Sequence, residues 1–256
     1  MAAEIQIREC ATIKEFDACI KLQRDVFGLP DLEISPRRHL IVSRQAGGWT
    51  LGAFVEDRLV GFVHHLVAIQ AGEIAGYSHM MAVAVDYQNK GLGAQLKWAQ
   101  RERALSEGRK FIKWTWEPMR ARNAHFNLNR LGAIVEGYAE NFYGTDFSLG
   151  RTAQNESGGG IDSDRVFASW HLRGDRVAEL AEGRQPRSLG VPACTISIPA
   201  DWMALLRDDL SLARRELLRV RQEFTQAFAS GLVCAGFDRA ATEPRYLLYS
   251  HSQMAA

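Results

Sequence analysis

The sequence predicts an α+β to α/β protein, in which a mixed, mostly antiparallel sheet flanked by helices is followed by a C-terminal α/β extension. Three strand-like runs at 49–55, 59–69 and 77–85 are joined by short turns, which is typical of antiparallel strands. A helical segment at 91–108 then leads to a further strand-like run at 111–116. This strand–helix–strand crossover indicates that the sheet becomes parallel at that point.

The residues before these strands predict one strand and two helices. Residues 4–10 alternate in the manner of a short strand. Thr12 and Glu15 have the spacing of a capping box, which begins a helix that Gly28 ends. A second helix is expected over 36–47.

The remaining chain divides into a core, a linker and an extension. A helix at 123–130 and strands at 133–138 and 165–172 complete a core at 1–172, and polar, glycine-rich residues 151–160 predict a loop or disordered excursion. Residues 173–192 are polar and rich in helix breakers, so they form the predicted linker. The extension at 193–256 is expected to pack against the core or to form a homodimer surface. Its predicted elements are a strand at 194–198, one long helix at 201–230, and strands at 232–237 and 246–249.

Composition and cysteine spacing exclude several classes of protein. Thirty-one Lys and Arg balance 30 Asp and Glu, which argues against a dedicated nucleic-acid binder. Four cysteines lie far apart without a CxxC pair, and no apolar run is long enough to span a membrane. We therefore expect a cytoplasmic protein. His64 and His65 are adjacent on a strand and point to opposite faces, and no other His, Cys, Asp or Glu group has ligand spacing, so no metal is expected.

The segment at 81–96 is the most informative. An apolar strand runs into a polar turn whose two glycines, Gly91 and Gly93, stand at the start of a helix. Glycines there let backbone N–H groups approach an anion, and the helix N-terminus supplies unpaired donors, which suits a pyrophosphate. The sequence has neither the G-x-x-x-x-G-K-[ST] motif nor the third glycine of the dinucleotide fingerprint.

The motif Met81-Ala-Val-x-x-x-Tyr-Gln-Asn-Lys-Gly-Leu-Gly93 resembles the acyl-CoA-binding motif of the GNAT superfamily of N-acyltransferases. Residues 123–133 (NAHFNLNRLGA) resemble a later region of the same family, and the predicted element order agrees over 4–172. The resemblance implies a bacterial-type N-acetyltransferase whose sheet splays apart at an acyl-CoA cleft. It also implies direct attack of an amine, from a small molecule or a peptide, on acetyl-CoA in a ternary complex.

The resemblance further assigns cofactor contacts. Backbone groups of the strand would hold the pantetheine arm, and amides of the turn would hold the pyrophosphate, with Lys90 as a further contact or a solvent-facing lysine. Val85 departs from the family's usual proline. Asn123 and Asn127 would face the cofactor or substrate, or serve as helix caps. The cofactor residues are Met81, Ala82, Val83, Gln88, Asn89, Lys90, Gly91, Leu92, Gly93, Ala94, Asn123 and Asn127.

Three residues are candidates for proton transfer. His79 is the first candidate base, on the same side of its strand as Met81 and Val83, although a packed, hydrogen-bonded histidine is the alternative. Glu117 is the second candidate base. Leu128 stands where the family carries a tyrosine acid, so Tyr143, Tyr138 or water would protonate the thiolate.

The departure at Leu128 keeps a second function open. A chain that retained the cofactor cleft but lost turnover would be a catalytically weak acyl-CoA-binding or regulatory module. A transferase of a longer acyl group is a third alternative, because Met80 and Met81 offer adaptable walls.

Overall fold

A computed structural model describes residues 4–70, 72–146, 160–239 and 242–255, so most of the loop predicted at 151–160 lies outside the described residues. The chain forms two compact units, Met1–Lys113 and Trp114–Ala256. None of the helices in the described ranges combines the length and the apolar character that crossing a membrane requires.

The sheet of the first unit confirms the predicted antiparallel order and the switch to parallel pairing. Its strands pair antiparallel in chain order, and β4 then pairs in parallel with the start of β5 through Gly76↔Ile112 and Tyr77↔Lys113. Strand β4 begins four residues earlier than predicted because its ladder with β3 extends to Gln70↔Glu73. The strands are β1 (Ile5–Glu9), β2 (Trp49–Val55), β3 (Arg58–Gln70), β4 (Glu73–Val83) and β5 (Phe111–Trp116).

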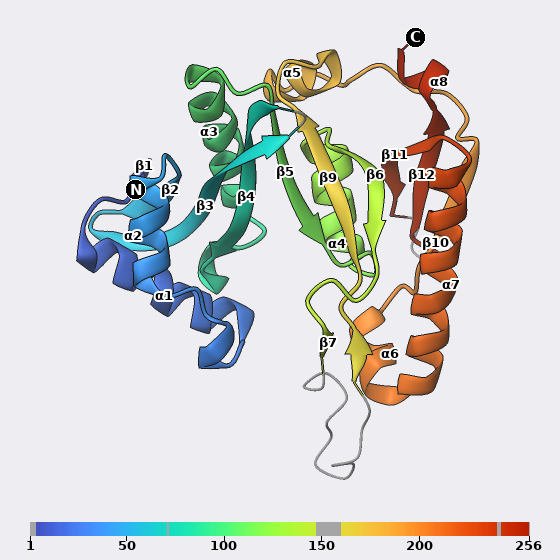
Figure 1. Cartoon of the computed structure of the whole chain (residues 1–256), viewed down its shortest axis with the longest axis horizontal. Helices are drawn as coiled ribbons and strands as arrows, with labels where there is room; N and C mark the ends of the chain where they lie inside the picture. Colours follow the sequence, from blue (N-terminus) through green and yellow to red (C-terminus); the bar gives the residue numbers. More distant parts are fainter. Residues whose placement is uncertain (1–3, 71, 147–159, 240–241, 256) are drawn as a thin grey trace. The chain divides into compact units, whose positions relative to one another are not determined.

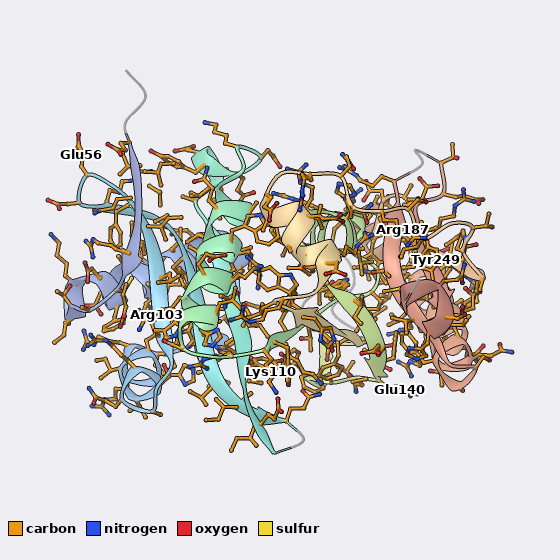
Figure 2. The ribbon with its side chains drawn as sticks, turned by 90° about the horizontal axis from the view of Figure 1, so that it is seen from above. Glu56, Arg103, Lys110, Glu140, Arg187 and Tyr249 are labelled. Atoms are coloured by element: carbon orange, nitrogen blue, oxygen red, sulfur yellow. The ribbon has the colours of Figure 1, made fainter. Side chains whose placement is uncertain are left out.

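Helices cover both faces of this sheet (Figure 1). On one face α1 (Ile13–Phe27) and α2 (Arg37–Gln45) pack with Phe54 and Phe62. On the other face Leu92 and Leu96 of α3 (Leu92–Ser106) pack against strand residues that include Val63. On α3, Arg103 (Figure 2) pairs with Glu9 of β1 and so ties the helix to the first strand. The short turns η1 (Asp31–Glu33) and η2 (Val85–Tyr87) complete the unit.

The capping box predicted at the start of α1 is confirmed. The Glu15 N–H donates to Thr12 Oγ1, and Glu15 Oε2 accepts from the Thr12 N–H. Gly28 closes the helix in the left-handed conformation, with φ of 62°. The boundaries of this helix are therefore set by side chains and a glycine within the segment itself.

The second unit is built on a sheet with strand order β9-β6-β11-β12-β10, and β6 is antiparallel to both of its neighbours. A separate two-stranded ribbon pairs Thr145 with Asp162. The sheet strands are β6 (Ile134–Ala139), β9 (Arg165–His171), β10 (Cys194–Ser197), β11 (Leu232–Asp238) and β12 (Arg245–Ser250), and the ribbon is formed by β7 (Thr145–Asp146) and β8 (Ile161–Asp162).

The long helix predicted at 201–230 is wrong, because two helices lie there. Asp209 adopts an extended conformation between α6 and α7, and its carboxylate accepts from the Leu212 N–H as an N-cap. The apolar stripe of α7 nevertheless faces the core as expected, since Ala213, Leu217 and Phe224 are buried. The described helices of this unit are α4 (Ala121–Ala124), the π-helix η3 (His125–Arg130), α5 (Asp175–Ala181), α6 (Trp202–Asp208), α7 (Leu210–Ala229) and α8 (His251–Ala255).

The C-terminal extension continues the sheet of the second unit. Strand β11 pairs with β6 through Cys234↔Val135, and the Asn129 amide bonds both the N–H and the C=O of Phe237 at 2.9 Å. The segment predicted as a linker, 173–192, contains the helix α5. The compact units divide after residue 113, and a separately folding core at 1–172 stays a prediction.

Candidate functional site

The turn before α3 presents unpaired backbone donors. Gly91 is the N-cap with φ of 85°, and Asn89 also has positive φ, so the chain folds back tightly into the helix. The Gln88 side chain closes the turn by donating to Val83 O at 2.9 Å. The N–H groups of Gln88 and Ala94 already donate to Val85 O and Gly91 O. Among the described residues, the N–H groups of 89–93 have no such partner. The amides available to hold a pyrophosphate are therefore those of these five residues.

Two cations flank this turn. Lys90 Nζ lies 5.9 Å from the centroid of the Tyr87 ring, and the Arg58 guanidinium lies 5.8 Å from the same centroid. Arg58 also lies 4.0 Å from Asp86. Sequence reasoning missed Arg58 because it is the first residue of β3, far from this turn in the sequence, and only the pairing of β3 with β4 brings it here.

The predicted strand contacts lie at the end of β4. Ala82 is buried against the α1 and α2 face, whereas Met81 and Val83 pack on the α3 face. The described parallel pairing of β4 with β5 covers only Gly76 and Tyr77, and β4 continues for six residues beyond it. Backbone groups along this last part of β4 therefore border an edge that a ligand can pair with.

The predicted orientation of His79 is wrong because β4 contains a bulge. His64 pairs with Met80 but His65 pairs with Ser78, so His79 is an extra residue in the ladder. Its ring lies 5.3 Å from the ring of His39 in α2 and 5.9 Å from that of His64, on the face opposite Met81 and Val83. Burial, followed by the neighbouring His39, lowers the pKa of His79 to about 4.

A buried polar network occupies the α3 face of the same strands, and sequence reasoning missed it. Lys97 donates to Ser78 Oγ at 3.0 Å and to Gln100 Oε1 at 2.7 Å. Gln100 in turn contacts His65 Nδ1, and the His65 ring stacks on Trp49 at 4.0 Å between centroids. Burial lowers the pKa of the Lys97 amine well below its usual value. The opposite orientation predicted for His64 and His65 is confirmed.

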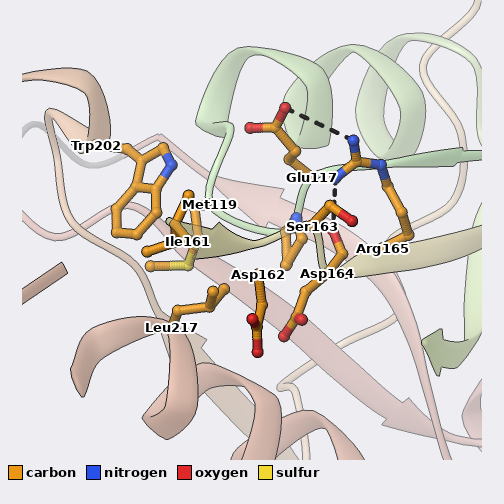
Figure 3. Close-up of a pocket in the computed structure, with 10 residues that line it drawn as sticks. Glu117, Met119, Ile161, Asp162, Ser163, Asp164, Arg165, Trp202 and Leu217 are labelled. Atoms are coloured by element: carbon orange, nitrogen blue, oxygen red, sulfur yellow. Dashed lines mark hydrogen bonds and ion pairs between the residues drawn. The ribbon is translucent and has the colours of Figure 1, made fainter. Parts of the chain in front are cut away.

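In the second unit, two of the predicted proton-transfer residues share a neighbourhood. Arg165 lies 4.0 Å from Glu117, and its guanidinium lies 5.0 Å from the centroid of the Tyr143 ring, which is exposed. Glu117 and Arg165 line a cavity of about 40 Å³. Figure 3 shows Trp202 and Leu217 on one side of this cavity and the Glu117–Arg165 pair on the other. The C-terminal helices α6 and α7 thus contribute the apolar wall.

The other predicted residues of this unit do not share a surface. Asn123 is exposed, whereas Asn127 is buried and its Oδ1 accepts from Trp114 Nε1 at 3.2 Å. Residues 125–130 form a π-helix, so the spacing of four no longer places both amides on one side. Leu128 is fully buried. Tyr138 donates to Asp164 at 2.6 Å, and burial followed by this contact raises the pKa of Tyr138, which makes it a poor acid.

Comparison with known proteins agrees with this arrangement. The model described as the Acetyltransferase (GNAT) family matches residues 16–132. A protein described as a GNAT-family acetyltransferase from Desulfovibrio desulfuricans shares 17% identity at a TM-score of 0.52, covering 66% of this chain and 99% of its own. The ribosomal-protein-S18-alanine N-acetyltransferase of Escherichia coli shares 14% at a TM-score of 0.51, with 66% and 94% covered. No curated protein sequence matches significantly.

The likeness to these structures shows the fold, and the family match includes the turn before α3 and the bulged strand β4. The mixed, open, mostly antiparallel sheet flanked by helices is the one that the sequence predicts. Residues 16–132 of the chain thus match the family of acetyltransferases described as GNAT, and the solved structures share its fold.

Proposed function

We propose that this chain transfers the acetyl group of acetyl-CoA to an amine, which attacks the thioester directly while both substrates are bound. The observation that carries the proposal is the row of five N–H groups at 89–93, at the start of a helix of 15 residues. Aligned N–H groups and the helix dipole favour a pyrophosphate at this position. Lys90 and Arg58 add positive charge beside it.

The edge of β4 supports the remaining cofactor contacts. We assign the pantetheine amides to the backbone of Met81, Ala82 and Val83, which lie beyond the residues of β4 paired with β5. An N–H near Val83 would then stabilise the oxyanion of the tetrahedral intermediate. In the reaction the amine nitrogen bonds the carbonyl carbon and gives up a proton to the base. The C–S bond then breaks, and the departing thiolate takes a proton from the acid to form the free thiol of CoA.

Glu117 and His79 are the two proposed bases. Glu117 borders a cavity and lies near Tyr143 through Arg165, so a base and an acid for the thiolate come from one neighbourhood. His79 presents an imidazole at a bulge of β4, the strand proposed to hold the pantetheine arm. Asn123 keeps its proposed ligand contact because it is exposed, whereas the Asn127 amide oxygen is occupied by Trp114.

The cavity beside Glu117 suggests the class of acceptor. A carboxylate faces an apolar wall of Trp202 and Leu217, so we propose a primary amine attached to an apolar group, in a small molecule or at the end of a peptide. The Escherichia coli relative of similar fold is named for an alanine of a ribosomal protein. The cytoplasmic location and the homodimer surface stay predictions.

Two glycines, one before α3 and one after it, provide a matched test of the cofactor site. Gly91 and Gly108 both have positive φ, and a Cβ added to either meets no atom within 4 Å. Ala at either position strains the backbone by about 1 kcal/mol. We expect Gly91→Ala to raise the KM for acetyl-CoA and Gly108→Ala to leave it unchanged. Equal KM values in the two variants would contradict the assignment of the turn.

A second pair of variants identifies the base. Loss of a general base lowers kcat by about 10²- to 10⁴-fold, so Glu117→Gln or His79→Asn should show this loss in an assay of CoA thiol release. Unaltered turnover in one variant excludes that residue. Tyr143→Phe tests the acid in the same assay.

The alternative, a catalytically weak acyl-CoA-binding or regulatory module, is favoured by one observation. Leu128 is buried where the family carries its acid, and Tyr138 is bound to Asp164. Saturable CoA binding without transfer to any amine of a broad panel would establish this module and exclude the transferase.

A further inference from the structure

Three histidines from separate elements converge in the first unit. His39 comes from α2, His64 from β3 and His79 from β4, and one ring nitrogen of each lies within 4.8 Å of the others. The ring centroids are 5.3 Å apart for His39 with either partner and 5.9 Å for His64 with His79. The bulge in β4 produces this convergence because it places His79 on the same face as the other two rings.

Hydrogen bonding does not explain why these rings face one another. The His39 Nε2 atom is buried and has no hydrogen-bond partner, although a buried nitrogen without one is costly. The rings cross at steep angles, and no hydrogen bond joins any two of the three histidines in the described structure.

Each ring nitrogen of His64 contacts the hydroxyl group of a neighbouring side chain. Its Nε2 contacts Ser43 Oγ at 3.1 Å, and its Nδ1 contacts Thr50 Oγ1 at 2.8 Å. If a metal ion replaced the hydroxyl contact of one ring nitrogen, the other ring nitrogen would keep its hydroxyl contact. Such an outer contact fixes the tautomer and the ring orientation of a metal ligand. His79 is exposed, so solvent reaches the cluster from its side.

We propose that His39, His64 and His79 bind one divalent transition-metal ion such as Zn²⁺, with water in the fourth position. Three imidazole side chains and no carboxylate within the group select a borderline metal over Ca²⁺ or Mg²⁺. Tetrahedral Zn²⁺ with Zn–N bonds near 2.0–2.1 Å brings ligand nitrogens to about 3.3 Å from one another. The three nitrogens lie within 4.8 Å of one another here, so the ion would have to draw them closer together. This site goes beyond acetyl transfer and does not depend on it.

Zn²⁺ titration of the full chain, freed of metal by a chelator, tests the site by calorimetry. The wild type should bind Zn²⁺ saturably at one site per chain. The single variants His39→Ala and His79→Ala should each weaken Zn²⁺ binding by at least about tenfold. Loss of a residue that only hydrogen-bonds a metal ligand already weakens binding by about this factor, so loss of a ligand should weaken it at least as much. The matched control is His251→Ala, which removes an exposed histidine of the other unit.

Circular dichroism and thermal unfolding identify which variants are folded, and only these count. Gln in place of His39 or His79 provides a second substitution of similar size if Ala disturbs the fold. Weakened binding in folded variants of both residues, with His251→Ala unchanged, supports the site. Absence of saturable binding to the wild type, or equal affinity in the wild type and the folded His39 and His79 variants, overturns it.

Discussion

The two units bury their titratable groups in opposite ways. The first unit buries basic nitrogens among neutral partners: Lys97 donates to Ser78 and Gln100, and His65 contacts Gln100. The second unit buries a carboxylate among donors. Asp164 accepts from the Tyr138 hydroxyl, from the Asn141 N–H and twice from Arg221.

The difference shows two solutions to the desolvation of a charge. Lys97 donates to the neutral side chains of Ser78 and Gln100, and burial lowers the pKa of its amine, so folding favours the neutral form. The Asp164 carboxylate is compensated by the Arg221 guanidinium and by two further hydrogen bonds, from the Tyr138 hydroxyl and the Asn141 N–H. Stability of the first unit should therefore depend on the protonation of Lys97, and stability of the second on an intact pair.

The largest expected effect is that of Arg221→Met. The Asp164 side chain has no exposed surface, so removal of its cation leaves a buried charge, which costs about 3–5 kcal/mol. The free energy of unfolding from urea denaturation measures this loss. Because Arg221 also pairs with Glu140 (Figure 2) and Asp162, the double variant Asp164→Asn with Arg221→Met should recover only part of it.

Arg219→Met is the control on the same helix. Arg219 pairs with Glu216 and Glu223 at a more exposed position, where such pairs contribute about 1 kcal/mol or less. Equal losses for Arg219→Met and Arg221→Met would show that burial of Asp164 does not set the effect.

An intermediate effect is expected for Lys97→Met, and it depends on pH. Below the unfolded pKa of about 10.4, Lys97 carries a proton more often in the unfolded chain than in the folded chain. The free energy of unfolding of the wild type therefore rises with pH in this range. Between about pH 7 and 8.5 the wild type should gain up to about 1.4 kcal/mol per pH unit relative to the variant. Urea denaturation at several pH values measures this slope.

Lys110→Met is the matched control for this slope. Lys110 is 69% exposed and pairs with Glu73, so its replacement removes a lysine amine that is not buried (Figure 2). A slope for Lys97 no larger than that for Lys110 would mean that Lys97 stays charged in the folded chain, and the contrast with Asp164 would fail.

Features encoded within a few residues were predictable, and those assembled from distant segments were not. The capping box of Thr12 and Glu15 and the glycine turn at Gly91 are local, and both are confirmed. The N-cap at Asp209 is also local: an aspartate three residues before Leu212 was a readable signal for a second helix start within the predicted long helix.

The histidine cluster had no comparable signal. His39, His64 and His79 have no ligand spacing, and they meet only because β4 carries a bulge that strand alternation does not show. The π-helix at His125–Arg130 likewise separates Asn123 from Asn127, which helical spacing would join. The partners of Lys97 come from β4 and α3, so burial of this amine follows from tertiary packing alone.

The smallest expected effect comes from Glu15→Gln, which tests whether burial or donor number decides the cost. Glu15 accepts from the Ala11 and Thr12 N–H groups and pairs with Arg8, a donor set like that of Asp164 at a partly exposed site. Although burial raises it, these contacts lower the pKa of Glu15 to about 2, from 4.5. The stability from this carboxylate is therefore present above pH 4.5 and lost as the pH falls toward 2. Thermal unfolding should show a loss of about 1 kcal/mol at pH 7 that shrinks in acid, with Glu33→Gln as the exposed control. A loss of stability as large as that of Arg221→Met would mean that the number of hydrogen-bond donors around a carboxylate, rather than its burial, decides the cost of disturbing it.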